Sequence, residues 1–420
     1  MPPPLSSRVM PDRSRRRVLE ADRWLPRVRR LGLVMLAGLP GWVGCTAAGG
    51  DVSPAAAGGS SGAVRMSAQA LRPPQLSGLS SPATSFRVER EPWSYTLATG
   101  QTVPGWVLTS PNYRLHTTLT NTAVAERLIR TLEAGLIAYR DVAPTSAPTT
   151  TPMEAWIFAE RRHWMDFTRR TTGADARLYL QITRGGYAVG DRFVSYFTAE
   201  RDALSVAAHE GFHQFVARHF AGRLPPFLEE GLSCTFERVE IETGRGGAER
   251  IRINRSINPQ RAYSLRTVID RRATWRLDEL IQLHAGRVVG QPGARIEAFY
   301  AQSWAFARFL QEYDNGRYLP AFRRWMADTV AGTVVDPTGT HRRAQPLWDP
   351  AAVRPILEHY LETDLSTLQQ EFAAWCRYIA FDEFPRHWSR SAAGDSSGPG
   401  VAVVSWTSVA RASSSIAMRP

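Results

Sequence analysis

Two histidines one helical turn apart are the residues of this sequence that point most directly to chemistry. They lie in the segment His209-Glu210-Gly211-Phe212-His213. Residues four positions apart share one face of a helix, so both imidazoles can bind one Zn²⁺, and the intervening glutamate can reach a water at the metal. The flanking residues are apolar, and charged groups in a dry site need a partner such as a metal ion. The alternative interpretation is two structural helix histidines with a surface glutamate.

A catalytic zinc ion needs a third protein ligand and keeps one position open. His219 follows His213 at the spacing of HExxHxxGxxH, but Val216 stands where that motif has glycine. In an unbroken helix His219 points about 240° further round than His213, and a β-branched residue disfavours the turn that would bring it back. We therefore expect His219 to be a helix-end histidine, whose positive charge the helix dipole favours. Glu230 is the better candidate for the third ligand.

Two helices must position these side chains. Thr198 is a suitable N-cap for the first helix, which should run to Gly222. Pro225-Pro226 then interrupts the chain and starts a second helix that runs through Glu237. If the second helix packs back on the first, it brings Glu230 toward the two imidazoles. The core face of the first helix is expected to be apolar: Leu204, Ala208, Phe212, Phe215 and Val216.

The second helix carries a recognisable frame, Leu224-Pro225-Pro226-Phe227-Leu228-Glu229-Glu230-Gly231-Leu232-Ser233. Together with HExxH it resembles the gluzincins of the MA clan of metallopeptidases, in which a helix of the type WLNEGLA carries the third zinc ligand. Glu230 falls on that ligand, and Glu237 falls on an acidic position that supports the site. Farther along, Tyr300-Ala301-Gln302-Ser303-Trp304 is similar to the YxQS helix of uncharacterised bacterial members. The resemblance covers roughly residues 185 to 315.

The resemblance implies a zinc metallopeptidase that hydrolyses peptide bonds of a peptide or protein substrate. His209, His213 and Glu230 would hold one Zn²⁺ per chain. Glu210 would be the general base that activates the attacking water and later protonates the leaving amine. Tyr300 is a candidate donor to the oxyanion, with a packed helical tyrosine as the alternative.

Two further roles follow from the same resemblance. Glu237 would accept a hydrogen bond from a ligand imidazole. The strand from Arg192 to Phe197, entered through Gly185-Gly186, would be the edge strand that pairs with an extended peptide substrate.

The sequence departs from the gluzincin pattern without removing a ligand. Glu229 replaces the usual Asn, Phe227 replaces the usual Trp, and Ser233-Cys234-Thr235 stands where Ala-Glu-Tyr is common. Cys234 lies one turn from Glu230. It can face the metal, be a structural thiol or form a disulfide with Cys376.

The remaining pattern predicts an α+β fold. The resemblance implies a zincin-like catalytic domain with an N-terminal α/β lobe and a mostly helical C-terminal lobe. Residues 102–118 are β-like with a hairpin at Pro111-Asn112, residues 122–139 are helical, and residues 153–158 form a strand before a helix that begins near Arg161. Helices are expected at 298–313, 319–326 and 365–379.

The domain organisation follows from composition. Residues 1–45 resemble an export leader: an Arg-rich segment, an apolar stretch, and Val43-Gly44-Cys45, which resembles a bacterial lipobox and would make Cys45 a lipidated N-terminus. Plain secretion is the alternative. Residues 46–85 are a disordered Ala/Gly/Ser/Pro tether, residues 86–388 are the catalytic domain with lobes at about 86–222 and 223–388, and residues 389–420 are a disordered tail. Location in the cell envelope is therefore expected.

Charge and composition exclude several classes. The 420 residues carry a net charge of +12, every basic residue is Arg, and the excess lies at the two ends, because residues 90–385 hold 35 Arg and 33 acidic residues. A nucleic-acid-binding face would concentrate the excess on the folded part, so no nucleic-acid partner is expected. No apolar run is long enough for a transmembrane helix, so membrane contact is expected only through a lipid anchor.

Two other functions fit the same residues. One is a catalytically inactive gluzincin-like module that binds envelope partners, and the other is a zinc amidase that acts on cell-wall peptides. No anchoring motif of the GxMEN kind is visible, so an aminopeptidase is not supported. The substrate, the choice between endo- and exopeptidase action and the oligomeric state stay open.

Overall fold

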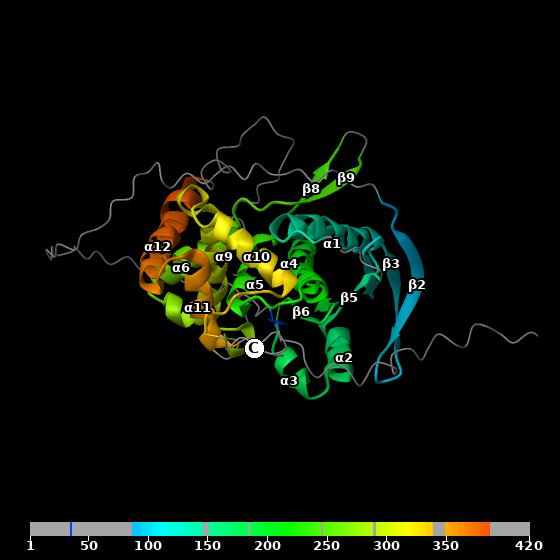
Figure 1. Cartoon of the computed structure of the whole chain (residues 1–420). Helices are drawn as coiled ribbons and strands as arrows, with labels where there is room; N and C mark the ends of the chain where they lie inside the picture. The colour runs from blue at the N-terminus through cyan, green and yellow to red at the C-terminus, as the bar shows by residue number, and fades with distance from the viewer. Residues whose placement is uncertain are drawn as a thin grey trace, which may run out of the picture.

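The protein has the predicted α+β architecture, with a mixed sheet and its helices followed by a mostly helical part. The computed structural model describes residues 34–35, 86–145, 151–183, 185–244, 247–288, 291–338 and 349–386. In Figure 1 the strands β2 and β3 lie at one end of the molecule and the yellow to orange C-terminal helices at the other, with α4 and α5 between them. The candidate ligands therefore sit where the two parts meet.

The sheet has six strands that come from residues 89–196. They are β2 (Glu89–Thr96), β3 (Thr102–Thr109), β4 (Tyr113–Thr117), β5 (Met153–Phe158), β6 (Gly186–Val189) and β7 (Arg192–Tyr196). The order is β6-β7-β5-β4-β3-β2, and the two-residue strand β1 (Val34–Met35) pairs with β6. β4, β5 and β7 are parallel to one another, whereas the other pairs are antiparallel. The predicted β3–β4 hairpin at Pro111-Asn112 and the strand at 153–158 are confirmed.

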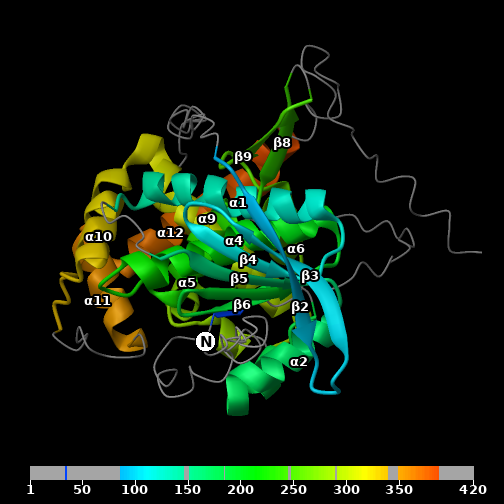
Figure 2. The same cartoon turned by 90° about the vertical axis from the view of Figure 1, so that its right-hand side faces the viewer.

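Helices cover both faces of the sheet. α1 (Thr122–Val142) packs on β3, β4 and α4, and α4 (Glu200–His219) packs on β6 and β7, while α2 (Arg161–Thr172) lies against β5 and β7. In Figure 2, α1 lies above the strands and α2 below them. Alternation along β5 explains this arrangement, because Ala155 and Ile157 are buried on one face while Trp156 stacks on Phe167 of α2 on the other.

The prediction of Arg192 to Phe197 as an edge strand is wrong. This segment forms β7, which pairs with β5 on one side and β6 on the other, so it lies inside the sheet. The reason is a hairpin: Gly190 adopts a positive φ of 63° and reverses the chain between β6 and β7. Gly186 permits this pairing, since a Cβ there would lie 2.8 Å from Ser195 Cβ. Among the described strands, the outer ones are the two-residue β1, which pairs with β6, and β2 at the opposite edge.

The C-terminal part begins with α5 (Pro226–Thr235) and is mostly helical. The long helix α9 (Gly293–Gly316) packs along α5 and also contacts α10 (Leu319–Ala331) and α12 (Leu365–Arg377). The other elements are the β8–β9 hairpin (Val239–Thr243 and Glu249–Ile253), which projects from the body in Figure 2, and the helical segments α3 (Ala176–Tyr179), α6 (Pro259–Asp270), α7 (Leu277–Leu280), α8 (Ala285–Val288), α11 (Pro350–Leu361), η3 (Gly173–Asp175) and η4 (Tyr378–Glu383).

The predicted boundaries of the two site helices need small corrections. α5 ends at Thr235 with the C-cap Phe236, so Glu237 lies just after the helix and not within it. α4 begins at Glu200 after the N-cap Ala199, whose side chain makes no capping bond, so Thr198 lies one residue too early. The helix ends at His219 rather than Gly222, because the chain turns there to bond the end of α10. The predicted core face of α4 is buried throughout.

Several predictions about the ends of the chain fall on residues that are not described. They include Cys45, the tether at 46–85 and the tail at 389–420. Within the described part of the chain, no helix combines the length and the apolarity that crossing a bilayer requires.

Candidate metal centre

The two histidines of α4 lie side by side, as their spacing predicts. Their ring centroids are 5.1 Å apart, and the side chains are buried. α4 is held close to α1 at Gly211, where a Cβ would lie only 2.7 Å from the hydroxyl of Tyr139. That hydroxyl donates to the carbonyl of Ala208, which fixes the turn from which His209 projects. Close packing against α1 therefore orients the imidazoles.

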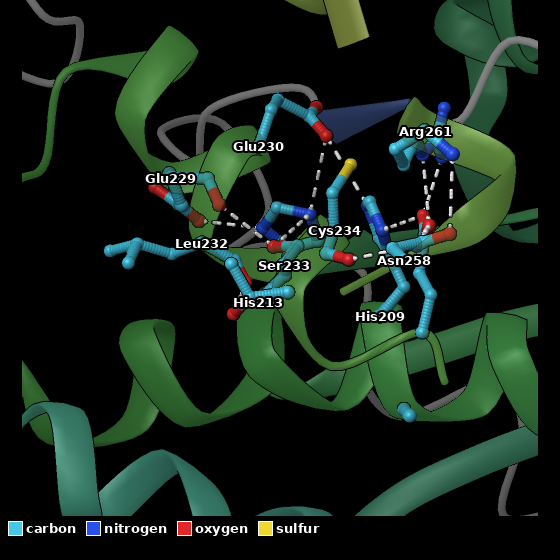
Figure 3. A network of polar contacts seen from close by, with 12 residues as sticks. His209, His213, Glu229, Glu230, Leu232, Ser233, Cys234, Asn258 and Arg261 are labelled. Carbon is cyan, nitrogen blue, oxygen red and sulfur yellow. Dashed lines mark hydrogen bonds and ion pairs between the residues drawn. The ribbon is translucent and has the colours of Figure 1, made fainter. Parts of the chain in front are cut away.

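Glu230 is brought to the histidines by α5. Its Oε2 lies 3.2 Å from Nε2 of His209 and 3.7 Å from Nε2 of His213. The position of α5 depends on Gly231, because a Cβ there would lie 2.1 Å from the backbone oxygen of Ser303 on α9. The ligand atoms of His209, His213 and Glu230 lie within 4.8 Å of one another and could hold a metal ion. The structure thus brings together the three predicted ligands, and Figure 3 shows Glu229, Glu230 and Ser233 gathered around the two imidazoles.

Each of the two imidazoles also contacts a carboxylate through Nδ1, the nitrogen that faces away from the ligand group. Nδ1 of His209 lies 3.0 Å from Glu237, as predicted, and Nδ1 of His213 lies 2.8 Å from Glu229. A carboxylate on Nδ1 fixes the ring so that Nε2 faces the metal position and makes that nitrogen a stronger donor. Sequence reasoning treated Glu229 only as a departure from Asn. The only sequence feature that pointed to a role for Glu229 at the site was its position next to Glu230 in the first turn of α5.

A buried arginine that the sequence analysis missed supports Glu237. Arg261, at the start of α6, donates two hydrogen bonds to the two carboxylate oxygens of Glu237, at 2.8 and 2.5 Å, and Asn258 donates a third at 2.8 Å. Burial alone would raise the pKa of Glu237, but the charge of Arg261 and the bonds from His209 and Arg261 lower it to about 2. Glu237 is therefore a carboxylate at any physiological pH. No local pattern in the sequence links Arg261 to a residue 24 positions away.

Glu210 differs from the other acidic residues of the site. It is fully buried, and among the described residues neither of its carboxylate oxygens has a hydrogen-bond partner. Burial raises its pKa to about 7. An unpartnered buried carboxyl group is costly, and the charges of His209, His213 and Glu230 act on Glu210. The orphaned oxygens and the convergent His/His/Glu group together fit a metal ion with a water.

The charges of the candidate ligands also fit a metal ion at this site. Burial opposes the charge of both imidazoles, but the bonds to Glu229, Glu230 and Glu237 outweigh it, so the pKa of His209 is raised and that of His213 is raised to about 10. Burial also opposes the charge of Glu230, yet the two histidines lower its pKa. Without a metal ion, protons on the imidazoles balance the acidic residues. A divalent cation can replace those protons.

Tyr300 lies on α9 and is buried. Its ring is 5.3 Å from the guanidinium carbon of Arg261, and Arg261 in turn holds Glu237. This contact links the predicted oxyanion donor to the ligand His209 through two intermediate residues.

Cys234 has no disulfide partner. Cys234 and Cys376 are both free and buried, so the alternative of a disulfide between them is not what the structure contains. The thiol of Cys234 forms a second group with His209 and Glu237 that has the spacing of metal ligands. Arg261 already supplies a positive charge to this group, and burial raises the pKa of the thiol well above its usual value. The structural-thiol alternative for Cys234 therefore fits better than a second cation site.

His219 ends α4 and is not part of the ligand group, as expected from helix geometry. The expectation that the helix dipole favours its positive charge is wrong. Burial and the nearby Arg140 and Arg218 lower its pKa.

A comparison with protein-family models and with curated proteins finds no match for this chain.

Proposed function

We propose that this protein is an exported zinc-dependent metallopeptidase that hydrolyses peptide bonds. The observation that carries the proposal concerns the buried Glu210, which has no hydrogen-bond partner among the described residues. It is close enough to the converging side chains of His209, His213 and Glu230 for their charges to act on it. A structural pair of helix histidines would not require an orphaned carboxyl group next to it, because burying one without a partner costs stability. A metal-bound water on which Glu210 can act would explain why this buried carboxyl group accompanies the three ligand side chains.

Two nitrogens and one carboxylate oxygen are the ligand set of catalytic zinc sites of the His/His/Glu kind. His209, His213 and Glu230 would hold one zinc ion per chain. When bound, zinc supplies Lewis acidity that polarises the substrate carbonyl and makes a water easier to deprotonate.

Glu210 has the position and the protonation behaviour of a general base. Its carboxyl group takes the proton of the attacking water and then passes it to the nitrogen of the leaving amine. Proton transfer is most efficient when the pKa of the catalytic group lies near the working pH, and burial raises the pKa of Glu210 toward that range.

Tyr300 is the proposed donor to the oxyanion. The positively charged Arg261 lies over its ring and favours any negative charge that develops on the phenol oxygen. This assignment rests on the resemblance of the Tyr300–Trp304 segment to the YxQS helix.

An extended peptide is the proposed substrate, and β6 is the strand that would bind it. Val34 and Met35 already pair antiparallel with Ala188 and Tyr187 of β6, so a substrate strand would take the place of these two residues. α4, which carries both histidines, packs directly on β6. A substrate strand added here would pass beside the helix that holds the metal ligands.

Export and lipid anchoring are part of the same proposal. They rest on residues 1–45 and on Val43-Gly44-Cys45. Replacing Cys45 with Ser should move the protein from the membrane fraction to the soluble exported fraction; a protein that is soluble before the change argues against the anchor.

The test of the proposed activity compares the parent chain with Glu210→Gln on a peptide library and on peptidoglycan fragments. The proposal expects cleavage of peptides by the parent and none by the variant, with the metal content unchanged. Cleavage of peptidoglycan fragments alone would favour the amidase. Metal binding without cleavage of either substrate would favour the inactive binding module.

A further inference from the structure

Ser233 lies on the metal side of His213. Its Oγ is 3.1 Å from Nε2 of His213, the nitrogen that faces the ligand group. The same hydroxyl lies 2.8 Å from the backbone oxygen of Glu229, one turn earlier in α5. Ser233 is fully buried. No other serine or threonine hydroxyl among the described residues contacts a candidate ligand nitrogen.

The hydrogen-bond directions show how the hydroxyl is oriented. A serine has one proton to donate and lone pairs to accept with. The backbone oxygen of Glu229 can only accept, so it takes the proton of Ser233. With that proton donated to Glu229, the oxygen of Ser233 keeps its lone pairs, and it lies beside Nε2 of His213. A metal ion bound to Nε2 would take the place of a proton on that nitrogen, and the lone pairs of Ser233 are then available to the metal.

The distance agrees with this arrangement. In a tetrahedral zinc site with bonds of about 2.0–2.1 Å, two ligand atoms lie roughly 3.3 Å apart. The separation of Ser233 Oγ from Nε2 of His213 is 3.1 Å, and the separation of Glu230 Oε2 from Nε2 of His209 is 3.2 Å. Ser233 is therefore spaced from its neighbour as a ligand on the same ion would be.

Cys234 does not compete for this place. Its thiol has the spacing of a metal ligand with His209 and Glu237, and it is not part of the group of His209, His213 and Glu230.

We propose that Ser233 provides a fourth, neutral protein oxygen to the metal ion. The inference rests on the proposed function, since it needs a metal held by His209, His213 and Glu230. A neutral hydroxyl is a weak ligand compared with a carboxylate, so water or a substrate carbonyl can displace it.

The first experiment measures metal affinity by competition with a chelator, on the full chain and on Ser233→Ala. A contact worth about one hydrogen bond corresponds to a loss of roughly fivefold in affinity. Alanine is a better helix former than serine, so the fold is expected to persist. Thr235→Val is the matched control, because Thr235 is also buried on α5 and its hydroxyl bonds only a backbone oxygen in the described contacts. It should leave the affinity unchanged.

The second experiment replaces zinc with Co²⁺ and records the absorption spectrum of the parent and of Ser233→Cys. Thiolates are strong ligands for soft and borderline metals, so a sulfur at position 233 should add a sulfur-to-cobalt charge-transfer band in the near ultraviolet. The parent should lack this band although it contains Cys234. Neither readout depends on catalysis.

The outcomes separate the two proposals. A parent chain that binds no metal would overturn the proposed function and this inference with it. A parent that binds metal, with the same affinity in Ser233→Ala and no new band in Ser233→Cys, would overturn the role of Ser233 alone.

Discussion

Nδ1 of His213 lies 2.8 Å from a carboxylate oxygen of Glu229, the residue just before the candidate ligand Glu230. His209 has the equivalent contact with Glu237, at 3.0 Å. The two carboxylates differ in their surroundings. Arg261 neutralises Glu237, whereas no described basic side chain other than His213 forms an ion pair with Glu229. His213 is therefore backed by a net negative charge and His209 by a nearly neutral pair.

This asymmetry predicts that Glu229→Gln weakens metal binding. The amide oxygen can still accept the hydrogen bond from His213 but lacks the charge that makes the imidazole a stronger donor. Partners of ligand imidazoles typically contribute 10- to 100-fold to metal affinity, and we expect a loss of about tenfold. Chelator competition measures it. Equal affinity in the parent and in the variant would show that the charge of Glu229 has no part in the site.

Arg261→Met should destabilise the protein strongly. Arg261 and Glu237 are both buried, and removing the arginine leaves an uncompensated carboxylate beside His209. Breaking a buried pair in this way costs about 3–5 kcal/mol in the free energy of unfolding. Urea unfolding of the metal-free chain measures the change.

The control for this prediction is the double variant Arg261→Met with Glu237→Gln, which removes both charges and should recover part of the lost stability. If the single variant unfolds at the parent's urea midpoint, the pair does not support the site.

Gly231→Ala should disturb the ligand Glu230 although alanine adds only one methyl group. The added Cβ would lie 2.1 Å from the backbone oxygen of Ser303, so α5 and α9 must move apart. Overpacking of this kind costs about 1–3 kcal/mol, and the shift should also lower the metal affinity. Thermal unfolding and chelator competition report the two effects. Gly244→Ala is the control, since its nearest contact would be an ordinary 3.5 Å, and a similar loss in both variants would contradict the explanation.

A pH-dependent contribution to stability is expected from Glu240 in the β8–β9 hairpin. Burial opposes its charge, but hydrogen bonds from Arg252 and Asn254 outweigh burial and lower its pKa. The folded state then holds its proton less tightly than the unfolded state, so the contribution is fully present above the unfolded pKa of about 4.5. It is lost as the pH falls through the lower, folded pKa. Urea unfolding of the parent and of Glu240→Gln from pH 7 to pH 3 should show a stability gap that closes on acidification; a constant gap would refute it.

Much of the fold was predictable because its signals are local. The i, i+4 histidines, the Pro225-Pro226 helix start and the strand at 153–158 depend on short segments of sequence, and each appears where it is expected. The order of strands was not predictable in this way. The resemblance places an edge strand at residues 192–197, but the chain reverses at Gly190 and adds β6 outside this segment, because β-pairing is set by the whole sheet.

The residues of the candidate site likewise fall into those that local sequence predicts and those that it does not. The positions of His209, His213 and Glu230 follow from two helices with a short connection, so spacing and resemblance were enough to predict them. Glu229, Ser233 and Arg261 could not be assigned, because their contacts depend on the angle at which α5 packs on α4 and on the approach of α6. Those contacts are tertiary, and no periodicity in the sequence encodes them.

The central claim is that His209, His213 and Glu230 hold a metal ion. Its most direct test is elemental mass spectrometry of the purified full chain beside Glu230→Ala, after both are refolded with zinc. We predict about one zinc per chain in the parent and a sharply reduced content in the variant. A parent chain that retains no metal, or a variant that retains as much as the parent, would contradict the account.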